Sequence, residues 1–272
     1  MRKALLVAAA GALVLAVLAG VAYVYVTTRD AVQVRATGRS GLALTKARAS
    51  RDRGEYLYQT AARCAACHAR DLGGDFVLRS ELVGTLWGPN LTRGNPSVGA
   101  TYGTADFERA IRRGLRPDGM RLLMMPSLDY AAMSDDDVAS IIAYIRAAPA
   151  IERPVPPFRL GVVGRLMLLT GRLSFDSDRI PDTIPPGADP SGGLYPARIA
   201  GCLRCHGATG PAPLPASVDR GTFATVLDTG RDRNGRAISD HAVPSRPWRD
   251  ADVDVLFHCF QSAVRSGSPA GC

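Results

Sequence analysis

Two copies of one pentapeptide carry the clearest chemistry in this chain. Residues 64–68 read Cys-Ala-Ala-Cys-His, and residues 202–206 read Cys-Leu-Arg-Cys-His. Cys-x-x-Cys-His is the attachment signature of a c-type haem: the thiols form thioether bonds with its vinyl groups, and the histidine ligates the iron. The sequence therefore predicts two covalently bound haem c groups, held by Cys64, Cys67, His68, Cys202, Cys205 and His206.

Two other interpretations of these cysteines fit the sequence less well. A zinc site built from both Cys-x-x-Cys pairs would join residues 138 positions apart and would leave the histidine after each pair unexplained. A thioredoxin-like redox motif requires a β-α-β pattern, which this sequence lacks. The histidines therefore favour haem.

The N-terminus predicts where these sites lie in the cell. Residues 4–26 are 23 residues without a charge, long enough to span a lipid bilayer. Arg2 and Lys3 precede them, so the positive-inside rule keeps the N-terminus cytoplasmic and places everything after Arg29 on the periplasmic side. We expect a single-pass membrane anchor over 1–29. The alternative is a cleaved signal peptide, with Ala19 and Gly20 as small residues at a cleavage site.

The rest of the chain contains a repeat. After a polar tether over 30–50, helical periodicity covers a first repeat over 51–150 and a second, shortened repeat over 191–272. Phe223, Leu227, Gly230 and Gly235 match residues 116 positions earlier, whereas the haem motifs are 138 apart. We expect an all-α fold, with two helical domains in tandem behind one transmembrane helix.

The first repeat predicts its helices in detail. One runs into the haem motif, a second covers 104–114, and a third begins at Ser134 and carries an apolar stripe over 138–145. A proline-rich linker over 151–190 separates the repeats and contains an apolar stretch over 160–173. This stretch predicts either a short helix packed between the domains or one in contact with the membrane surface.

The order of motifs in the first repeat resembles the class I cytochrome c family. A helix enters Cys-x-x-Cys-His, followed by Gly-Pro-Asn-Leu-Thr at 88–92, Met125-Pro126, and the helix after Ser134. The chain is most similar to membrane-associated multihaem cytochrome subunits of bacterial dehydrogenases and to related dihaem cytochromes. The resemblance implies small helical domains around haem, working as electron carriers. It also implies that the carbonyl of Pro89 accepts a hydrogen bond from His68.

The resemblance further implies Met125 as the sixth ligand of the first haem iron, because a thioether favours ferrous iron. Met124 and Met120 lie nearby and are the alternatives.

The second haem departs from this pattern, because no methionine follows Met167. One repeat register aligns His241 with Met125 and predicts bis-histidine ligation; a rival register places Val243 there. A five-coordinate iron is the alternative. His258 is a weaker candidate, because it falls within the last helix.

Charge and the remaining cysteines add two expectations. The net charge of +8 favours anionic lipid or acidic redox partners. The arginines are scattered without a basic run, so no nucleic acid partner is expected. Cys259 and Cys272 are left over from the haem motifs, and outside the cytoplasm they predict a disulfide.

These expectations describe a membrane-anchored dihaem cytochrome c that passes single electrons, with a membrane dehydrogenase or terminal oxidase as partner. The alternatives are a haem enzyme, of the peroxidase or sulfur-compound dehydrogenase type, and a haem-based sensor. Both would use the second haem, and both need an open sixth coordination site.

Overall fold

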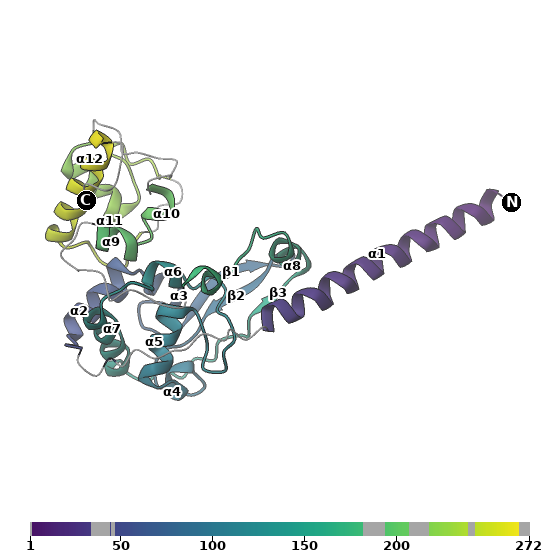
Figure 1. Cartoon of the computed structure of the whole chain (residues 1–272), viewed down its shortest axis with the longest axis horizontal. Coiled ribbons are helices and arrows are strands. Elements are labelled where there is room, and N and C mark those ends of the chain that lie inside the picture. Colours follow the sequence, from purple (N-terminus) through teal and green to yellow (C-terminus); the bar gives the residue numbers. More distant parts are fainter. Residues whose placement is uncertain are drawn as a thin grey trace.

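The computed structural model describes residues 2–33, 44, 47–181, 194–206, 218–238 and 243–266. Its most prominent element is α1 (Arg2–Gln33), which projects away from the rest of the protein (Figure 1). Within it, Arg2–Val26 is long and apolar enough to cross a membrane, and none of its most apolar window is buried. The predicted apolar N-terminal helix is thus present.

The first repeat is built around two crossing helical segments. α2 (Arg51–Tyr56) continues into a π-helical turn, η2 (Leu57–Ala61), and packs across α7 (Asp135–Ala147). A Cβ atom on Gly54 would overlap the backbone carbonyl of Ser140, so only glycine allows this approach. Arg53 and Asp137 pair across the crossing at 2.8 Å. The crossing therefore fixes the helix that enters the first haem motif.

The predicted helices of this repeat are confirmed. Ser134 caps α7 through its hydroxyl, which accepts a hydrogen bond from the Asp137 backbone N–H. Val138, Ile141, Ile142 and Ile145 form the expected buried stripe. α5 (Thr104–Arg113) ends at Gly114, whose φ of 63° is the left-handed conformation favoured at a helix C-terminus. The shorter helices are α3 (Ala65–His68), α4 (Val98–Thr101) and α6 (Ser127–Tyr130).

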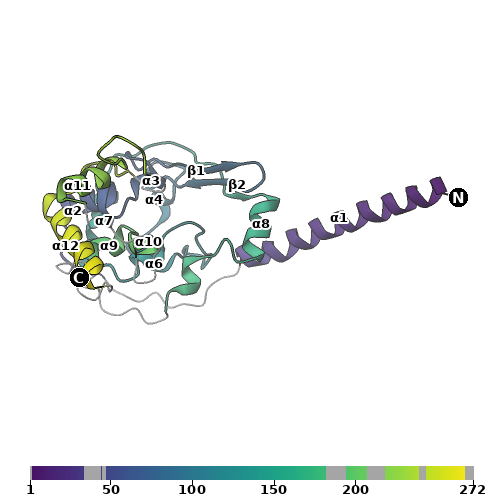
Figure 2. The same ribbon diagram turned by 90° about the horizontal axis from the view of Figure 1, so that it is seen from above.

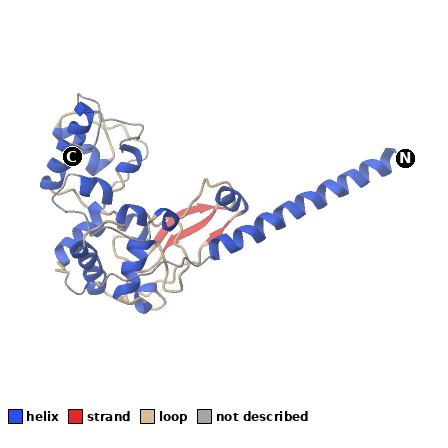
Figure 3. Ribbon diagram, viewed as in Figure 1, coloured by secondary structure: helices blue, strands red, loops and turns tan. Residues whose placement is uncertain are grey.

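The expectation of an all-α fold was wrong in one respect. A three-stranded antiparallel sheet follows the first haem motif, with β2 (Gly84–Gly88) between β1 (Asp75–Ser80) and β3 (Arg159–Leu160) (Figure 3). Phe76, Val77, Thr85 and Trp87 are β-branched or aromatic residues, which suit a half-buried strand. The third strand comes from the predicted linker, so local periodicity did not reveal the sheet.

Residues of the predicted linker lie along the first repeat. The side-chain amide of Asn90 donates to the carbonyl of Ile151 at 2.7 Å, and Arg153 pairs with Asp71 at 2.8 Å. After β3 come α8 (Val162–Leu169) and the 3-10 helix η3 (Asp176–Arg179). The helix expected within 160–173 is therefore present, and it packs against α1 and β2.

The second repeat contains α9 (Leu194–Ile199), α10 (Leu203–His206), α11 (Arg220–Thr229) and α12 (Asp250–Ser266). α11 ends at Gly230 with a φ of 64°, as α5 ends at Gly114. The following turns also agree: Leu122 N–H donates to Gly114 at 2.7 Å, and Ile238 N–H donates to Gly230 at 2.8 Å. The same local structure thus occurs twice at the predicted offset of 116 residues.

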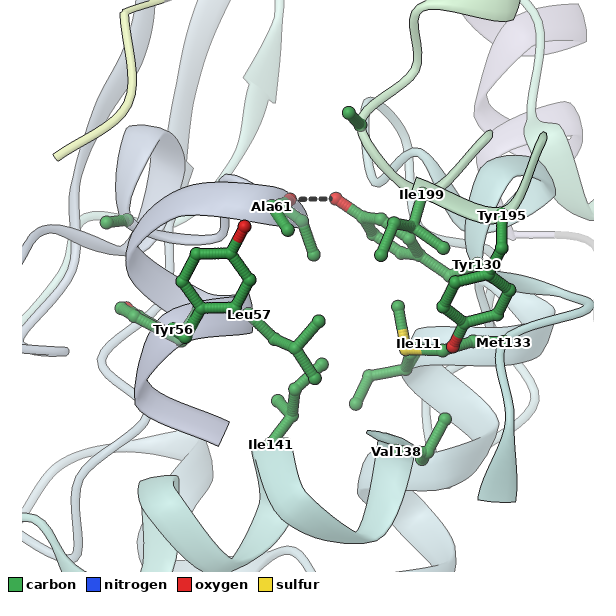
Figure 4. Close-up of a cluster of buried hydrophobic side chains, with 14 of the residues drawn as sticks. Tyr56, Leu57, Ala61, Ile111, Tyr130, Met133, Val138, Ile141, Tyr195 and Ile199 are labelled. Atoms are coloured by element: carbon green, nitrogen blue, oxygen red, sulfur yellow. Dashed lines mark hydrogen bonds between the residues drawn. The ribbon is translucent and has the colours of Figure 1, made fainter. Parts of the chain in front are cut away.

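The two repeats share one buried cluster. Tyr195 and Ile199 of α9 point toward the same centre as Leu57, Val138 and Ile141 of the first repeat (Figure 4). The Tyr195 hydroxyl donates to the carboxylate of Asp137 at 2.7 Å. The described parts of the repeats therefore pack as neighbours around a common core, on the side of the molecule away from α1 (Figures 1 and 2).

Candidate haem sites

A cavity of about 260 Å³ lies in the first repeat. Its walls are mostly apolar and come from the haem motif, β2, α5, α7 and the loop before α6. The structure brings the following predicted site residues to this one cavity: Cys64, Cys67, His68, Pro89 and Met125. An apolar cavity lined by two thiols, an imidazole and a thioether has the chemistry that a covalently attached haem requires.

The first motif forms a single helical turn. The backbone N–H of Cys67 donates to the Cys64 carbonyl at 3.1 Å, and that of His68 donates to the same oxygen at 2.9 Å. Arg63 and Ala69 flank the turn with φ values of 52° and 61°, a strained conformation for residues other than glycine. This geometry places both cysteines and the histidine on one tight turn. Burial raises the pKa of Cys64 to about 12.

His68 is oriented by the expected partner. Its Nδ1 lies 2.9 Å from the carbonyl oxygen of Pro89. A carbonyl oxygen only accepts, so Nδ1 carries the proton and Nε2 keeps its lone pair for a metal. Burial lowers the pKa of His68, and the Pro89 bond partly opposes that shift. The neutral imidazole, which is the form that binds iron, is therefore favoured.

Gly88 lies where the backbone at the end of β2 meets the backbone of the first haem motif. A Cβ atom at position 88 would overlap the carbonyl of Cys67, so only glycine allows β2 to end directly against the haem motif. Thr92 and Asn90 then fix the chain after Pro89: the Asn90 side-chain oxygen accepts from the Thr92 backbone at 2.9 Å. The Pro89 carbonyl is thus held by backbone packing before it and by a side-chain hydrogen bond after it.

Three methionines line the cavity, and they differ in burial. Met125 is partly buried and packs against the hydrophobic core. Met124 is 50% exposed and has a φ of 69°. Met120 lies further back in the loop and is partly buried. Burial and packing favour Met125 over Met124 as the candidate ligand.

An unsatisfied donor provides an independent test of whether the cavity fits haem. The indole Nε1–H of Trp87 is buried and has no hydrogen-bond partner among the described residues, and Trp87 lines the cavity. Buried donors rarely stay unpaired, so such a group indicates a missing acceptor. A haem propionate would supply one, and the guanidinium groups of Arg116 and Arg121 line the same cavity. The residues that line the cavity therefore fit a haem group.

The second motif repeats the turn of the first. The backbone N–H groups of Cys205 and His206 donate to the Cys202 carbonyl at 3.2 and 2.8 Å. Cys205 is exposed and Cys202 is half-buried, and burial raises the pKa of Cys202 to about 11. The His206 ring stacks edge-on against Phe260 of α12, with centroids 5.5 Å apart. The local geometry for attachment therefore occurs twice.

The structure describes only some of the other residues predicted for the second repeat. His241 and Cys272 lie outside the described residues. His258 is exposed on α12, and its Nδ1 lies 2.8 Å from the Asp254 carbonyl of the same helix. It thus points along its own helix toward solvent. Cys259 is buried and disulfide-bonded.

Sequence reasoning missed the residues that join the two motifs. Arg63, directly before the first motif, donates to the carbonyl of Ala200 at 2.5 Å. Arg204, inside the second motif, pairs with Asp129 at 2.7 Å and with Asp176 at 2.6 Å. Arg204 stands out in the sequence as a charged residue between the two cysteines of the motif, but its partners come from distant parts of the chain. Trp87 was missed because its role depends on the unexpected sheet.

Comparison with known proteins agrees with this geometry. The family profile described as cytochrome C oxidase, cbb3-type, subunit III matches residues 49–145. The fructose dehydrogenase cytochrome subunit of Gluconobacter japonicus is 34% identical over 119 residues, which are 42% of this chain and 24% of that protein. The gluconate 2-dehydrogenase cytochrome c subunit of Pantoea cypripedii is 34% identical over 96 residues, covering 34% of this chain and 22% of its own length.

A longer match extends beyond the first repeat. The alcohol dehydrogenase (quinone) cytochrome c subunit of Gluconacetobacter polyoxogenes is 28% identical over 178 residues, which are 61% of this chain and 38% of that protein. The chain thus spans well under half the length of these relatives. The cavity, the oriented histidine and these matches agree: residues 49–145 are similar to the family described as cytochrome C oxidase, cbb3-type, subunit III, and the chain is similar to the cytochrome subunits of bacterial dehydrogenases.

Proposed function

We propose that this protein is a membrane-anchored dihaem cytochrome c that carries single electrons between periplasmic redox partners. The observation that carries the proposal is the His68–Pro89 hydrogen bond at 2.9 Å, inside an apolar cavity that also holds Cys64, Cys67 and Met125. The second Cys-x-x-Cys-His turn has matching backbone hydrogen bonds and supports a second covalent haem at Cys202, Cys205 and His206.

The chain's own residues would act by holding and insulating the cofactor. When bound, haem c supplies an iron that alternates between the ferric and ferrous states. His68 and Met125 would hold the iron, so that small molecules would be kept from it. The apolar walls exclude water and limit the change in solvation that accompanies a change of charge. Such a site transfers electrons without breaking a substrate bond.

A dehydrogenase is the partner class that the relatives support. The similar proteins are named as cytochrome subunits of fructose, gluconate and alcohol dehydrogenases. We infer that this protein receives electrons from a membrane dehydrogenase and passes them to a further membrane partner, such as a terminal oxidase. α1 would anchor it to the lipid bilayer, with the haem sites on the periplasmic side.

Counting the haems tests the proposal directly. The mass of the denatured protein should exceed that of the polypeptide by two haem groups, and a redox titration should resolve two potentials. The same mass reports whether α1 is retained in the mature protein. A mass gain of one haem would remove the second site from the proposal, and loss of the N-terminal segment would remove the anchor.

A paired substitution separates the carrier from the rival haem enzyme or sensor. If His241 ligates the second iron, the unmodified protein should not bind carbon monoxide at neutral pH, and His241→Ala should open that site. His258→Ala is the matched control, because His258 is exposed and bonds to its own helix. Rapid carbon monoxide binding by the unmodified protein, unchanged in His241→Ala, would favour the enzyme or sensor.

A further inference from the structure

Helix α8 exposes an apolar face that the rest of the described protein does not cover. Val162 is 55% exposed, Leu166 is 50% exposed and Leu169 is 44% exposed. These residues are spaced four and three positions apart, so they share one side of the helix. Leu82, at the tip of the β1–β2 hairpin, is 67% exposed. We call these four residues the α8 face.

The α8 face is held rigidly on the sheet. The backbone N–H of Gly161 donates to the Val83 carbonyl at 3.0 Å, and that of Val163 donates to the Leu82 carbonyl at 3.0 Å. A Cβ atom on Gly164 would overlap the Val83 carbonyl, so the helix lies directly against the hairpin. Leu82 and the helix therefore belong to one surface with a defined shape.

This surface lies against the C-terminal end of the apolar segment of α1. The guanidinium of Arg165 stacks over the ring of Tyr25 at 4.3 Å and donates to the Tyr25 carbonyl at 3.5 Å. Tyr25 is the residue before the end of the apolar segment Arg2–Val26. Tyrosine is enriched at the boundary between bilayer and water. α8 runs across this end of α1 (Figure 2), so it would lie along the plane of a membrane that α1 spans.

The charge around α8 fits the same environment. Residues 159–172 contain Arg159, Arg165 and Arg172 and no acidic residue. Basic residues beside an apolar helical face are typical of helices that lie in the interface and bind anionic headgroups.

We propose that the α8 face inserts into the outer-leaflet interface of the bilayer that α1 spans. This second attachment would hold the cytochrome c domain against the membrane in one orientation. The proposal rests on the anchoring by α1 proposed above. Its occupant is lipid, because the face continues directly from the end of the apolar helix.

Lipid photo-crosslinking tests this contact in the full haem-containing chain. The protein would be reconstituted into vesicles of phosphatidylcholine and phosphatidylglycerol that carry a photoactivatable lipid, and the adducts would be mapped by peptide mass. We expect adducts on α1 and on the peptides that contain the α8 face. Val162→Asp combined with Leu166→Asp should abolish adducts on α8 and leave those on α1 and the haem absorption spectrum unchanged.

Val243→Asp is the matched control, because Val243 is also 55% exposed but lies in the second repeat. It should leave all adducts in place. Adducts on α1 alone in the unmodified protein would overturn the α8 proposal and keep the anchor. Adducts on neither helix would overturn the anchor as well. Adducts on α8 that persist in the double variant would show that Val162 and Leu166 do not make the contact.

Discussion

At the scale of single residues, the proposed first haem site can be tested at the methionine that would ligate the iron. Met125→Ala should abolish the long-wavelength sulfur-to-iron absorption band and lower the potential of one haem, because the thioether favours ferrous iron. Met124→Ala is the matched control and should leave the band and both potentials unchanged, since Met124 is half exposed. Loss of the band in Met124→Ala alone would assign the ligand to Met124.

Trp87 gives a second prediction at this scale, and it concerns pH. If its buried Nε1–H donates to a haem propionate, Trp87→Phe removes a bond that stabilises the charged carboxylate. The propionate pKa should therefore rise, and the pH range over which the first haem's potential changes should move upward. A redox titration at several pH values measures this shift.

Trp248 is the control for this substitution, because it is the other tryptophan, is buried, and does not line the cavity. Trp248→Phe should leave the pH dependence of the potential unchanged. An unaltered pH profile in Trp87→Phe would mean that another group accepts the indole hydrogen.

Residue spacing and the family resemblance predicted much of the candidate site, but of the polar contacts that support it only the His68–Pro89 hydrogen bond. Cys64, Cys67 and His68 were predicted because attachment chemistry demands an invariant local spacing. The structure gives Pro89 the expected distance from His68, whereas the role of Met125 stays a prediction. Trp87 could not be predicted, because its burial depends on a sheet whose third strand lies about 70 residues further along the chain.

At the scale of the elements, the crossing of α2 and α7 depends on one glycine. Gly54→Ala would force a methyl group against the Ser140 carbonyl, which is backbone and cannot rotate away. We expect the free energy of unfolding to fall by about 1–3 kcal/mol, the usual cost of overpacking. Chemical denaturation of the holoprotein measures this change.

Gly221→Ala is the matched control, because Gly221 is an exposed helical glycine whose Cβ would meet only the Asp219 side chain at 3.3 Å. Because alanine has a higher helix propensity than glycine, this substitution should leave the free energy of unfolding unchanged or raise it by up to about 1 kcal/mol. Equal destabilisation by both substitutions would indicate that the helix crossing is not the cause.

Helices were easier to predict than the sheet for a physical reason. α5 and α7 carry their caps and apolar periods within their own sequence, so local rules suffice. β1 and β2 are short, and the pairing of β3 with β2 joins Gly84 to Leu160. Strands that pair across so many intervening residues leave no periodic pattern that local rules could detect in the sequence.

At the scale of the whole molecule, Arg204 links the second haem motif to the first repeat. Arg204→Ala would leave Asp129 and Asp176, whose side chains are only 13% and 12% exposed, without their shared cation. We expect a loss of about 1–3 kcal/mol in unfolding free energy, typical of hydrogen bonds between charged groups. Arg236→Ala is the control, since Arg236 forms an exposed pair within one loop.

The loss of unfolding free energy expected for Arg204→Ala should change with pH in a definite direction. Burial already raises the pKa of Asp129, and Arg204 opposes that shift. Without Arg204 the folded-state pKa rises further above the unfolded value, so the penalty appears as pH rises through that window and disappears below it. The stability difference between Arg204→Ala and the unmodified protein should therefore shrink on acidification. A difference that grows at low pH would contradict the assigned ion pair.

The common core of the two repeats has a consequence for how such a protein can be taken apart. A duplicated unit that keeps its own core can be excised, transplanted or deleted as a module. Here Tyr195 and Ile199 of the second repeat belong to the same buried cluster as side chains of the first, so the described parts of the two repeats share apolar interior. Removing one half would leave its neighbour with uncovered tyrosine and aliphatic surfaces. Chimaeras built from this chain should therefore exchange both repeats together.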